Sequence, residues 1–357
     1  MARAELVVDR LVATGFIRPS VLWRGLQHSR PSFSHWGVGW LIGLSGLLVE
    51  PLAWLQSCLY AQRLRRVQLP DDPIVIIGHW RSGTTYLHQL LASDPAVATA
   101  RNTLTMAPQV ALLLQPWIAP LMKAWMTRVR PIDAVPWGPD DPQEDELGLA
   151  RLTFDTNMGG MAFPRDYLAN FRRHVLETSK AYERQWLTFC RLTWLHDGAG
   201  KSHWLIKNSV HTARVRLVLK HFPRARFVLL RRSPVDSIRS LVQVKQRLGA
   251  LVGMQPLPDP PTQVEETATA HRELLEAFEA SRHLIPAQQL LELDYDDLIS
   301  QPLQAVEGIY TRFGLTSWPV AEAPIKARID RARSYTADPV QLPPLAERRL
   351  QELMKAS

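Results

Sequence analysis

The sequence has few cysteines and few lysines, and both shortages narrow what the protein can be. Cysteine occurs only at positions 58 and 190, which excludes a disulfide framework and fits a reducing compartment such as the cytoplasm. The net charge is +8, yet only eight of the 42 basic residues are lysine, and no Lys/Arg-rich block carries interleaved aromatic residues. We therefore expect the chain to bind a small polyanion or an anionic membrane surface, and not a nucleic acid.

The distribution of acidic residues is informative at two places, the N-terminus and the stretch after Asp94. Glu5 and Asp9 stand where a signal peptide would need an apolar core, so nothing predicts secretion. Between Asp94 and Asp133 there is no acid, and residues 96–131 are rich in Pro, Met and Trp. Such a segment is typical of an acceptor pocket or lid, although packing in the core would give the same composition.

A hydrophobic run long enough to cross a bilayer without interruption is also missing. Residues 38–60 are largely apolar, but Glu50 and Pro51 stand at their centre, and the uninterrupted run from Val38 to Val49 is too short to span. We expect residues 1–70 to form a helical apolar extension, with two short helices at this place. Residues 36–66 would lie in the membrane surface, form a homodimer interface or pack on the domain expected at residues 71–357. A helix that spans the membrane at residues 38–60 is the less favoured alternative.

What is present is a strand, loop and helix signature at residues 73–85. The residues from Ile74 to Ile77 are all β-branched, as in a short strand that is buried on both faces. Gly78 and Gly83 bound the loop that follows, and apolar residues then recur at helical spacing in residues 86–91. Such a loop directs backbone N–H groups and the positive end of a helix dipole at one point, which predicts a phosphate or sulfate site.

The loop has the glycine spacing of a P-loop but lacks its lysine, because Thr84 follows Gly83. Arg81 is the only cation within the loop, and the hydroxyl groups of Ser82, Thr84 and Thr85 surround it. A guanidinium can bind a phosphate or sulfate through two parallel hydrogen bonds. A nucleoside triphosphatase, by contrast, needs the lysine and an acid that helps to hold Mg²⁺. We therefore expect an anion site without a metal.

Two further strand and helix units predict cations at the same edge of a sheet. Residues 204–206 read as a strand that ends at Lys207, and residues 226–232 read as a strand that ends in two arginines. A helix that starts at Pro234 carries Ser240. Because the carboxyl ends of parallel strands meet at one edge, Lys207, Arg232 and Ser240 are expected beside the first loop. The predicted fold is α/β, a P-loop-type parallel sheet flanked by helices.

Acidic residues return at the start of another predicted helix. Asp141 is a candidate N-cap and Pro142 fits the first helical position. Glu144, Asp145 and Glu146 fall in the first turn, where the helix dipole favours acids without any catalytic role. One of them could instead be a base that faces the cation-lined site, and both interpretations stay open.

With both anion motifs in view, the chain resembles the sulfotransferase family that uses 3′-phosphoadenosine 5′-phosphosulfate (PAPS). The family's first signature, Pro-Arg-Ser-Gly-Thr-Thr or Lys-Ser-Gly-Thr after a strand, is similar to the loop from His79 to Thr85. Its second signature, an Arg followed eight positions later by Ser, is similar to Arg232 and Ser240. Lys207 resembles its strand-end lysine, although Ser209 replaces the proline of that turn. Weaker likenesses cover the chain as far as about residue 315, at residues 142–146, 293–298 and 304–313.

The resemblance implies a role for each motif. The residues that would hold the 5′-phosphosulfate are Arg81, Ser82, Gly83, Thr84 and Thr85, and those that would hold the 3′-phosphate are Arg232 and Ser240. We expect Arg81 and Lys207 to stabilise the charge on the departing bisphosphate, so that no metal is needed. The acceptor would be a hydroxyl group, and the apolar residues at 96–131 favour a hydrophobic or lipid-like alcohol.

The general base is the least determined part of this hypothesis. Related enzymes often carry a glutamate just after the P-loop helix, whereas residues 95–132 contain no acid. Glu144 and Glu146 are therefore the candidates, with His79, His88 and His211 behind them.

Two other functions remain open at this point. A P-loop nucleotide kinase or NTPase would bind ATP with Mg²⁺, and a non-catalytic nucleotide-binding protein at the membrane would bind the bisphosphate without transferring a sulfuryl group. In each case we expect a cytoplasmic protein, associated with the inner face of the membrane if residues 36–66 contact it.

Overall fold

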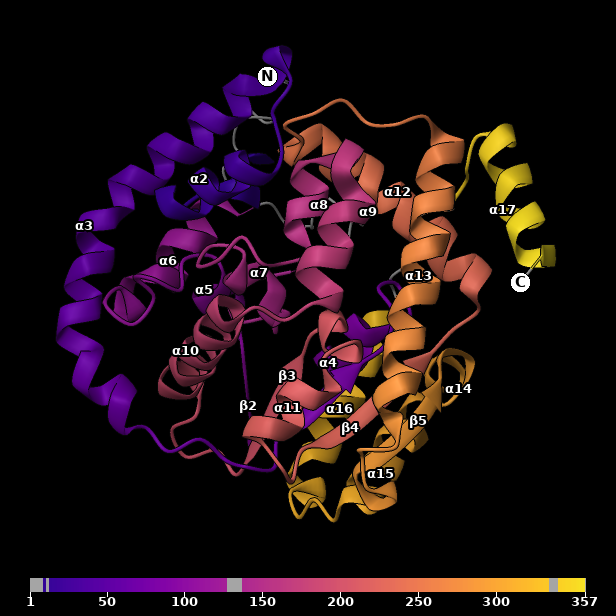
Figure 1. The fold of residues 1–357 in the computed structure, drawn as a ribbon. Coiled ribbons are helices and arrows are strands. Elements are labelled where there is room, and N and C mark those ends of the chain that lie inside the picture. Colours follow the sequence, from indigo (N-terminus) through magenta and orange to yellow (C-terminus); the bar gives the residue numbers. More distant parts are fainter. Residues whose placement is uncertain (1–8, 11–12, 127–136, 334–339, 357) are drawn as a thin grey trace.

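The computed structural model describes residues 9–10, 13–126, 137–333 and 340–356, and at its centre lies the predicted parallel sheet (Figure 1). Within these residues the five strands run in the order β2-β3-β1-β4-β5, and every pairing is parallel. The strands are β1 (Ile74–Ile77), β2 (Val97–Thr99), β3 (His203–Lys207), β4 (Arg226–Arg231) and β5 (Leu290–Asp294). The central position of β1 brings the loops after β1, β3 and β4 to the same edge of the sheet.

Helices cover both faces of the sheet, as the continuous apolar run in β1 predicts. Ile74 and Ile76 point into a core formed with α4 (Thr84–Leu91), α15 (Pro302–Phe313) and α16 (Trp318–Arg333). Val75 and Ile77 point into the opposite core, formed with α10 (Lys180–Asp197), α11 (Val215–His221) and α13 (Pro260–Arg282). Alternate side chains of a strand face opposite sides, so a strand between two helical layers must be apolar throughout.

The remaining elements lie around these layers. They are α5 (Asn102–Thr105), α6 (Gln115–Trp125), α7 (Asp145–Leu149), α8 (Met158–Ala162), α9 (Tyr167–Phe171), α12 (Pro234–Val252), α14 (Tyr295–Ser300) and α17 (Pro344–Ala356). Short 3₁₀ turns occur at Phe33–His35, Pro164–Asp166, Ser209–Thr212 and Ala287–Gln289, and η3 (Arg172–Leu176) is a π turn. Residues 127–131 of the predicted acceptor segment fall outside the described residues.

The structure differs from the expected elements in two places besides the N-terminus. Helix α7 begins at Asp145 with Glu144 as its N-cap residue, so Asp141 and Pro142 lie before the helix and do not start it. Residues 96–131 contain the edge strand β2, whose three residues are too few for a periodic pattern. Before α10 the chain turns at Pro164 and again in η3. There Arg214 donates hydrogen bonds to the carbonyls of His174, Val175 and Glu177, which holds the break in place.

The N-terminal extension contains α2 (Pro19–His28) and α3 (Trp36–Arg66), and α3 runs along one side of the molecule (Figure 1). The expectation of two short helices is wrong, because α3 continues through Pro51 as one helix of 31 residues. Pro51 and Leu47, whose carbonyl loses its usual donor, are both exposed, so the break in the hydrogen-bond ladder is not buried in the core. The stretch Phe33–Arg66 is long and apolar enough to cross a membrane, but 39% of its most apolar window is buried.

Candidate active site

The loop between β1 and α4 has the strained backbone that an anion cradle requires. Gly78 and Gly83 have φ values of +138° and +95°, and Arg81 has a φ of +70°, which is rare for a residue with a side chain. A Cβ atom at Gly78 would lie 2.5 Å from the carbonyl oxygen of Leu230 in β4. The local strain at Arg81 is of a kind that concentrates at functional sites, and it turns successive N–H groups towards one point.

The structure brings the two anion motifs into direct contact. Arg81 donates a hydrogen bond from Nε to Oγ of Ser240 at 2.9 Å, and Arg232 donates one to the carbonyl oxygen of Arg81 at 2.8 Å. The loop after β1 and the β4–α12 connection therefore form one cationic site, although Arg81 and Ser240 are 159 positions apart in the chain. The structure thus places Arg81, Arg232 and Ser240 beside one another, as expected from the sequence.

Tyr295 holds this arrangement together, and sequence reasoning assigned it no role. A Cβ atom at Gly83 would lie 2.6 Å from Cδ2 of Tyr295, so the ring packs directly on the glycine. The guanidinium carbon of Arg232 lies 4.2 Å from the centroid of the same ring, a cation–π contact. The position of Tyr295 could have predicted this contact, because the residue directly follows β5 at the edge of the sheet where Arg232 follows β4.

The hydroxyl groups of the loop differ in what they can reach. Ser82 is buried and donates to the carbonyl oxygen of His79 at 2.7 Å, so its side chain closes the turn. Thr84 is also buried and begins α4, whereas Thr85 is partly exposed. Thr212, which follows β3, donates to the carbonyl of Gly78 and accepts from its N–H at 2.8 Å. The loop is therefore tied to β3 as well as to β4.

Lys207 ends β3 one strand away from the loop, since it pairs with Ile76 in the sheet register. Its ammonium group forms an ion pair with the carboxylate of Glu144. The Lys207 side chain is 6% exposed and that of Glu144 is 20% exposed, so solvent or a ligand reaches the pair from the side of Glu144. The two predicted site residues thus meet at the edge of the sheet that carries Arg81.

Glu146 has a different environment from Glu144. It is buried, and its two oxygens accept hydrogen bonds from the N–H of Asn157 at 2.6 Å and from Nδ2 of Asn208 at 2.9 Å. Burial raises the pKa of Glu146. Asp145 lies between the two glutamates and is buried as well; its pKa is raised well above the usual value by desolvation and by both neighbouring carboxylates. Glu144 is the most accessible of the three acids.

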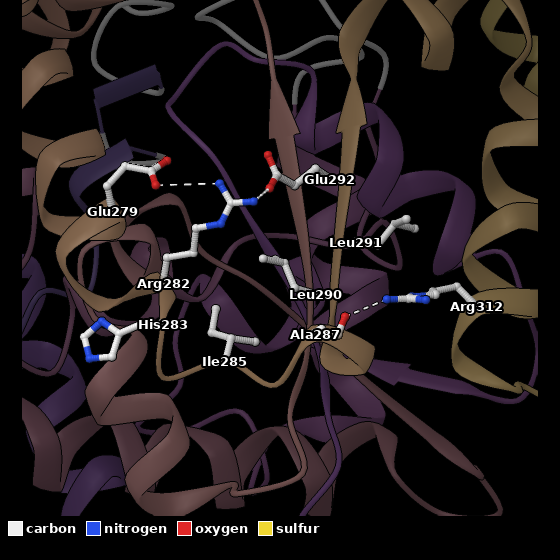
Figure 2. A pocket seen from close by; sticks show the side chains of 9 residues that line it. All are labelled: Glu279, Arg282, His283, Ile285, Ala287, Leu290, Leu291, Glu292 and Arg312. Carbon is white, nitrogen blue, oxygen red and sulfur yellow. Dashed lines mark hydrogen bonds and ion pairs between the residues drawn. The ribbon is translucent and has the colours of Figure 1, made fainter.

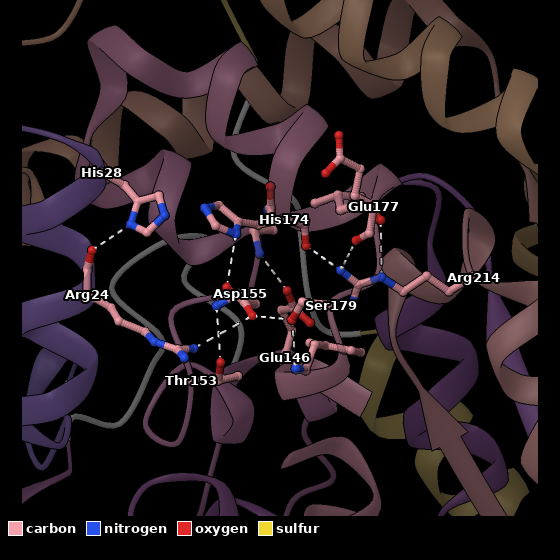
Figure 3. A network of polar contacts seen from close by, with 12 residues as sticks. Arg24, His28, Glu146, Thr153, Asp155, His174, Glu177, Ser179 and Arg214 are labelled. Atoms are coloured by element: carbon pink, nitrogen blue, oxygen red, sulfur yellow. Dashed lines mark hydrogen bonds and ion pairs between the residues drawn. The ribbon is translucent and has the colours of Figure 1, made fainter. Parts of the chain in front are cut away.

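A polar network connects the loop after Glu146 with the N-terminal extension (Figure 3). Asp155 forms an ion pair with Nδ1 of His174 at 3.2 Å and accepts a hydrogen bond from Ser179, the N-cap of α10. The guanidinium of Arg24 in α2 lies 3.9 Å from the same carboxylate. The contact with His174 is the largest of several influences that lower the pKa of Asp155 to about 2.

The three histidines considered as bases are all buried. Burial lowers the pKa of His79 and His88 well below the ordinary value and that of His211 to about 3, so each is neutral. His88 shares a hydrogen bond of 2.7 Å with Thr99, while the ring nitrogens of His79 and His211 have no partner among the described residues. Neutral imidazoles enclosed in the core favour packing roles.

Two further features of the described residues concern possible metal ligands and a hollow that lies apart from Arg81 and Lys207. No group of three or more His, Cys, Asp or Glu side chains that could hold a metal occurs in the described part of the chain. A hollow of about 680 Å³ lies at the amino end of β5, between α13 and α15 (Figure 2). Its main charges neutralise each other, since Arg282 pairs with Glu279 and Glu292. The strand ends with Arg81 and Lys207 are at the opposite edge.

The arrangement can bind an extended polyanion and act on it. Arg232 and Arg81 are joined around Ser240, and Lys207 lies at the end of the neighbouring strand beside a reachable carboxylate. Fixed cations at this edge suit phosphate or sulfate groups, and Glu144 is placed to accept a proton.

Comparison with known proteins agrees with this site. The sequence profile of the sulfotransferase family matches residues 73–319, from the first residue before β1 to the start of α16. The chain belongs to the sulfotransferase family. A sulfotransferase is a transferase, and the parallel sheet with its P-loop is consistent with that activity.

Named relatives of this sulfotransferase come from mycobacteria. Omega-hydroxy-beta-dihydromenaquinone-9 sulfotransferase Stf3 of Mycobacterium bovis is 25% identical over 311 residues, which cover 85% of this chain and 77% of that protein; the Mycobacterium tuberculosis protein matches equally. The crystal structure of sulfotransferase STF9 from Mycobacterium avium superposes with a TM-score of 0.65 at 16% identity, covering 94% of each chain. STF1 from M. tuberculosis gives 0.63 at 19% identity, covering 93% of this chain and 90% of that one. These two structures support the fold.

Proposed function

We propose that this sulfotransferase transfers the sulfuryl group of PAPS to a hydroxyl group of a lipid-like acceptor. The observation that carries the proposal is the contact of Arg81 with both Ser240 and Arg232. It joins the two anion motifs into one site with two positively charged ends, as a nucleotide with a 3′-phosphate and a 5′-phosphosulfate would need.

The donor would lie along the carboxyl edge of the sheet. Its 5′-phosphosulfate binds the loop of Arg81, Ser82, Gly83, Thr84 and Thr85, where the N–H groups at the start of α4 add their dipole. Its 3′-phosphate binds Arg232 and Ser240. Because Tyr295 fixes both Gly83 and Arg232, the two halves of the site keep a constant separation.

The reaction would proceed in line and without a metal. The acceptor oxygen forms a bond to sulfur while the bond from sulfur to the bridging oxygen of the 5′-phosphate breaks. Glu144 takes the proton of the hydroxyl group, and Lys207, released from its ion pair as Glu144 is neutralised, stabilises the charge on the bridging oxygen together with Arg81. The products are a sulfate ester and 3′-phosphoadenosine 5′-phosphate. Glu146, fully hydrogen-bonded by Asn208 and Asn157, positions this segment.

A lipid-like acceptor is favoured by the apolar segment next to the site and by one relative. Residues 96–126 contain no acid, and Arg101 and Asn102 bond this segment to the chain that carries Glu144. The relative Stf3 is named for its action on omega-hydroxy-beta-dihydromenaquinone-9. An alcohol at the end of an apolar chain fits both observations.

The deciding experiment is transfer of radiolabelled sulfate from PAPS to a panel of alcohols, run with EDTA and with Mg²⁺. We expect a labelled product from hydroxylated polyprenyl quinones or long-chain alcohols, with equal rates in both buffers. In a parallel measurement, 3′-phosphoadenosine 5′-phosphate should raise the melting temperature and ATP should not. Phosphate transfer from ATP that needs Mg²⁺ would show a kinase instead. Binding of the bisphosphate without transfer to any alcohol would show a non-catalytic protein.

A further inference from the structure

The outer face of α3 consists almost entirely of exposed apolar side chains. Every exposed residue between positions 36 and 59 is uncharged, and Ser57 is the only one of them with a polar side chain other than a tryptophan. The large side chains that define this face are Trp40, Leu44, Leu47, Leu48, Trp54 and Leu59, with Leu48 80% and Trp54 69% exposed. Over 24 residues the face is about 35 Å long, far more apolar surface than a monomer in water normally exposes.

The inner face of α3 is fixed to the domain. Val38, Ile42 and Val49 pack in the core, and Gly46 lies so close that a Cβ atom there would be 2.2 Å from the carbonyl oxygen of Ile17. Gln56 is buried, donates to the carbonyl of Pro108 and accepts from the N–H groups of Leu112 and Leu113. A helix on a protein in water buries its apolar residues and exposes polar ones on its outer side. In α3 the outer side is apolar as well, so it suits contact with an apolar medium.

The distribution of charged residues along α3 indicates which apolar medium its outer face would contact. Glu50, the acid at the centre of the apolar run, is turned to the side of the helix and forms a double hydrogen bond with Arg18. Arg63, Arg65 and Arg66 are exposed in the last turns of α3, and Trp36 and Trp40 lie at its other end. An apolar face without acids, ending in a basic cluster and carrying exposed tryptophans, matches an anionic bilayer interface.

The contacts of the inner face decide against a spanning helix. Crossing the bilayer would carry Gln56 and the Arg18–Glu50 pair, with the domain bonded to them, into hydrocarbon. Because its inner side is bonded to the domain, α3 can present only its outer side to lipid, and such a helix lies flat in the interface. We infer that the protein docks on an anionic membrane surface through the outer face of α3, with the helix parallel to the bilayer. Trp117 and Leu121 of α6 are exposed apolar side chains as well.

Docking of this kind does not depend on the proposed reaction. Vesicle binding needs neither PAPS nor turnover, so failure of one proposal leaves the other intact. The inner-leaflet location expected from the sequence stays a prediction.

The test uses the full-length protein and vesicles of phosphatidylcholine with about 30% phosphatidylglycerol. We expect the protein to sediment with these vesicles. Leu48→Glu, which puts a charge on the outer face, should reduce binding roughly tenfold or more. Leu345→Glu is the matched control on exposed α17, at the other side of the molecule, and should bind like the wild type (Figure 1). Replacing Arg63, Arg65 and Arg66 with Gln should also weaken binding roughly tenfold or more, as should high salt.

A second measurement locates the contact. Cys58 is exposed on α3 and Cys190 is buried, so a thiol-reactive environment-sensitive dye labels position 58. Its emission should shift to the blue when vesicles are added. In the double variant Cys58→Ser/Leu345→Cys, the dye on α17 should not respond.

Two results would overturn the inference. One is a wild-type protein that does not bind the vesicles under low salt. The other is a dimer in sedimentation velocity that dissociates on the Leu48→Glu change, with no vesicle binding, which would make the outer face of α3 an interface between two copies. Unchanged thermal unfolding of each variant shows that the fold is intact.

Discussion

The carboxyl edge of the sheet and the outer face of α3 differ in which side chains they bury and which they expose. At the sheet edge, charged groups are partly enclosed, and each has a defined partner: Arg81 with Ser240, Arg232 with Arg81 and Tyr295, Lys207 with Glu144. On α3, large apolar groups are exposed, although the helix also buries valine, isoleucine and small residues against the domain. Charged side chains are thus partly shielded from water at the sheet edge, whereas apolar side chains are exposed to water on α3.

This difference indicates that the two regions suit different partners. Clustered cations at a sheet edge favour an anionic ligand, and exposed leucines and tryptophans favour contact with an apolar phase. The partners that we propose are a polyanionic donor in one case and a membrane in the other. The two partners can be tested independently, because the changes below lie in different parts of the molecule.

The largest effect is expected for Arg81→Ala. The change removes the cation of the loop and its bond to Ser240, so the transfer rate should fall at least about a thousandfold. Single-turnover transfer from labelled PAPS measures it, with Arg216→Ala, an exposed arginine on α11, as the control. A wild-type rate for Arg81→Ala would remove this residue from the catalytic site.

A smaller effect, about a hundredfold in kcat, is expected for Glu144→Gln. Steady-state transfer from PAPS measures it, and the physical reason is the loss of the group that takes the proton of the acceptor. Glu146→Gln separates the two glutamates. Because Glu146 positions the segment and does not take the proton, kcat of its variant should fall less than that of Glu144→Gln. The roles are reversed if Glu146→Gln lowers kcat more than Glu144→Gln does.

The next effect concerns donor binding. Arg232→Ala should raise the KM for PAPS about 10- to 100-fold, since a hydrogen bond to a charged group is lost, with a smaller change in kcat. Binding of 3′-phosphoadenosine 5′-phosphate should weaken by a similar factor in calorimetry, while adenosine 5′-phosphosulfate, which lacks the 3′-phosphate, should bind both proteins equally. A selective loss in kcat would place Arg232 at the reacting sulfur instead.

The smallest effect is expected for a contact between the N-terminal extension and the domain. Asp155 links α2 to the chain after Glu146, and its pKa is lowered to about 2, so its carboxylate stabilises the fold at neutral pH. Asp155→Asn should lower the melting temperature by roughly 2–4 °C at neutral pH. As the pH falls through the usual aspartate range towards 2, the wild type loses this contribution and the two curves should converge. A constant difference would mean that the lost contact does not depend on ionisation.

Local patterns were sufficient for several parts of the fold and the site. The strand β1, its glycine-bounded loop and the start of α4 follow from adjacent residues, and so do the strand ends at Lys207 and Arg231. Short-range rules fail for β2, which has three residues, and for the turns before α10, which Arg214 holds from a distance. They also failed at Pro51, because the side of α3 on which it lies depends on how the helix packs.

The sequence by itself determined which groups are available: a glycine-bounded loop that contains an arginine and lacks the P-loop lysine, cations at two strand ends, and an acid-free apolar segment. Their spacing is local, so elementary backbone sterics and helix dipoles are enough to interpret it. Only the tertiary structure decided that Glu144 meets Lys207 while Glu146 is enclosed by Asn157 and Asn208, and that Glu50 turns to Arg18 and leaves the outer face of α3 without charge. These pairings join residues far apart in the chain, and they are set by the packing of whole elements, which no local pattern encodes.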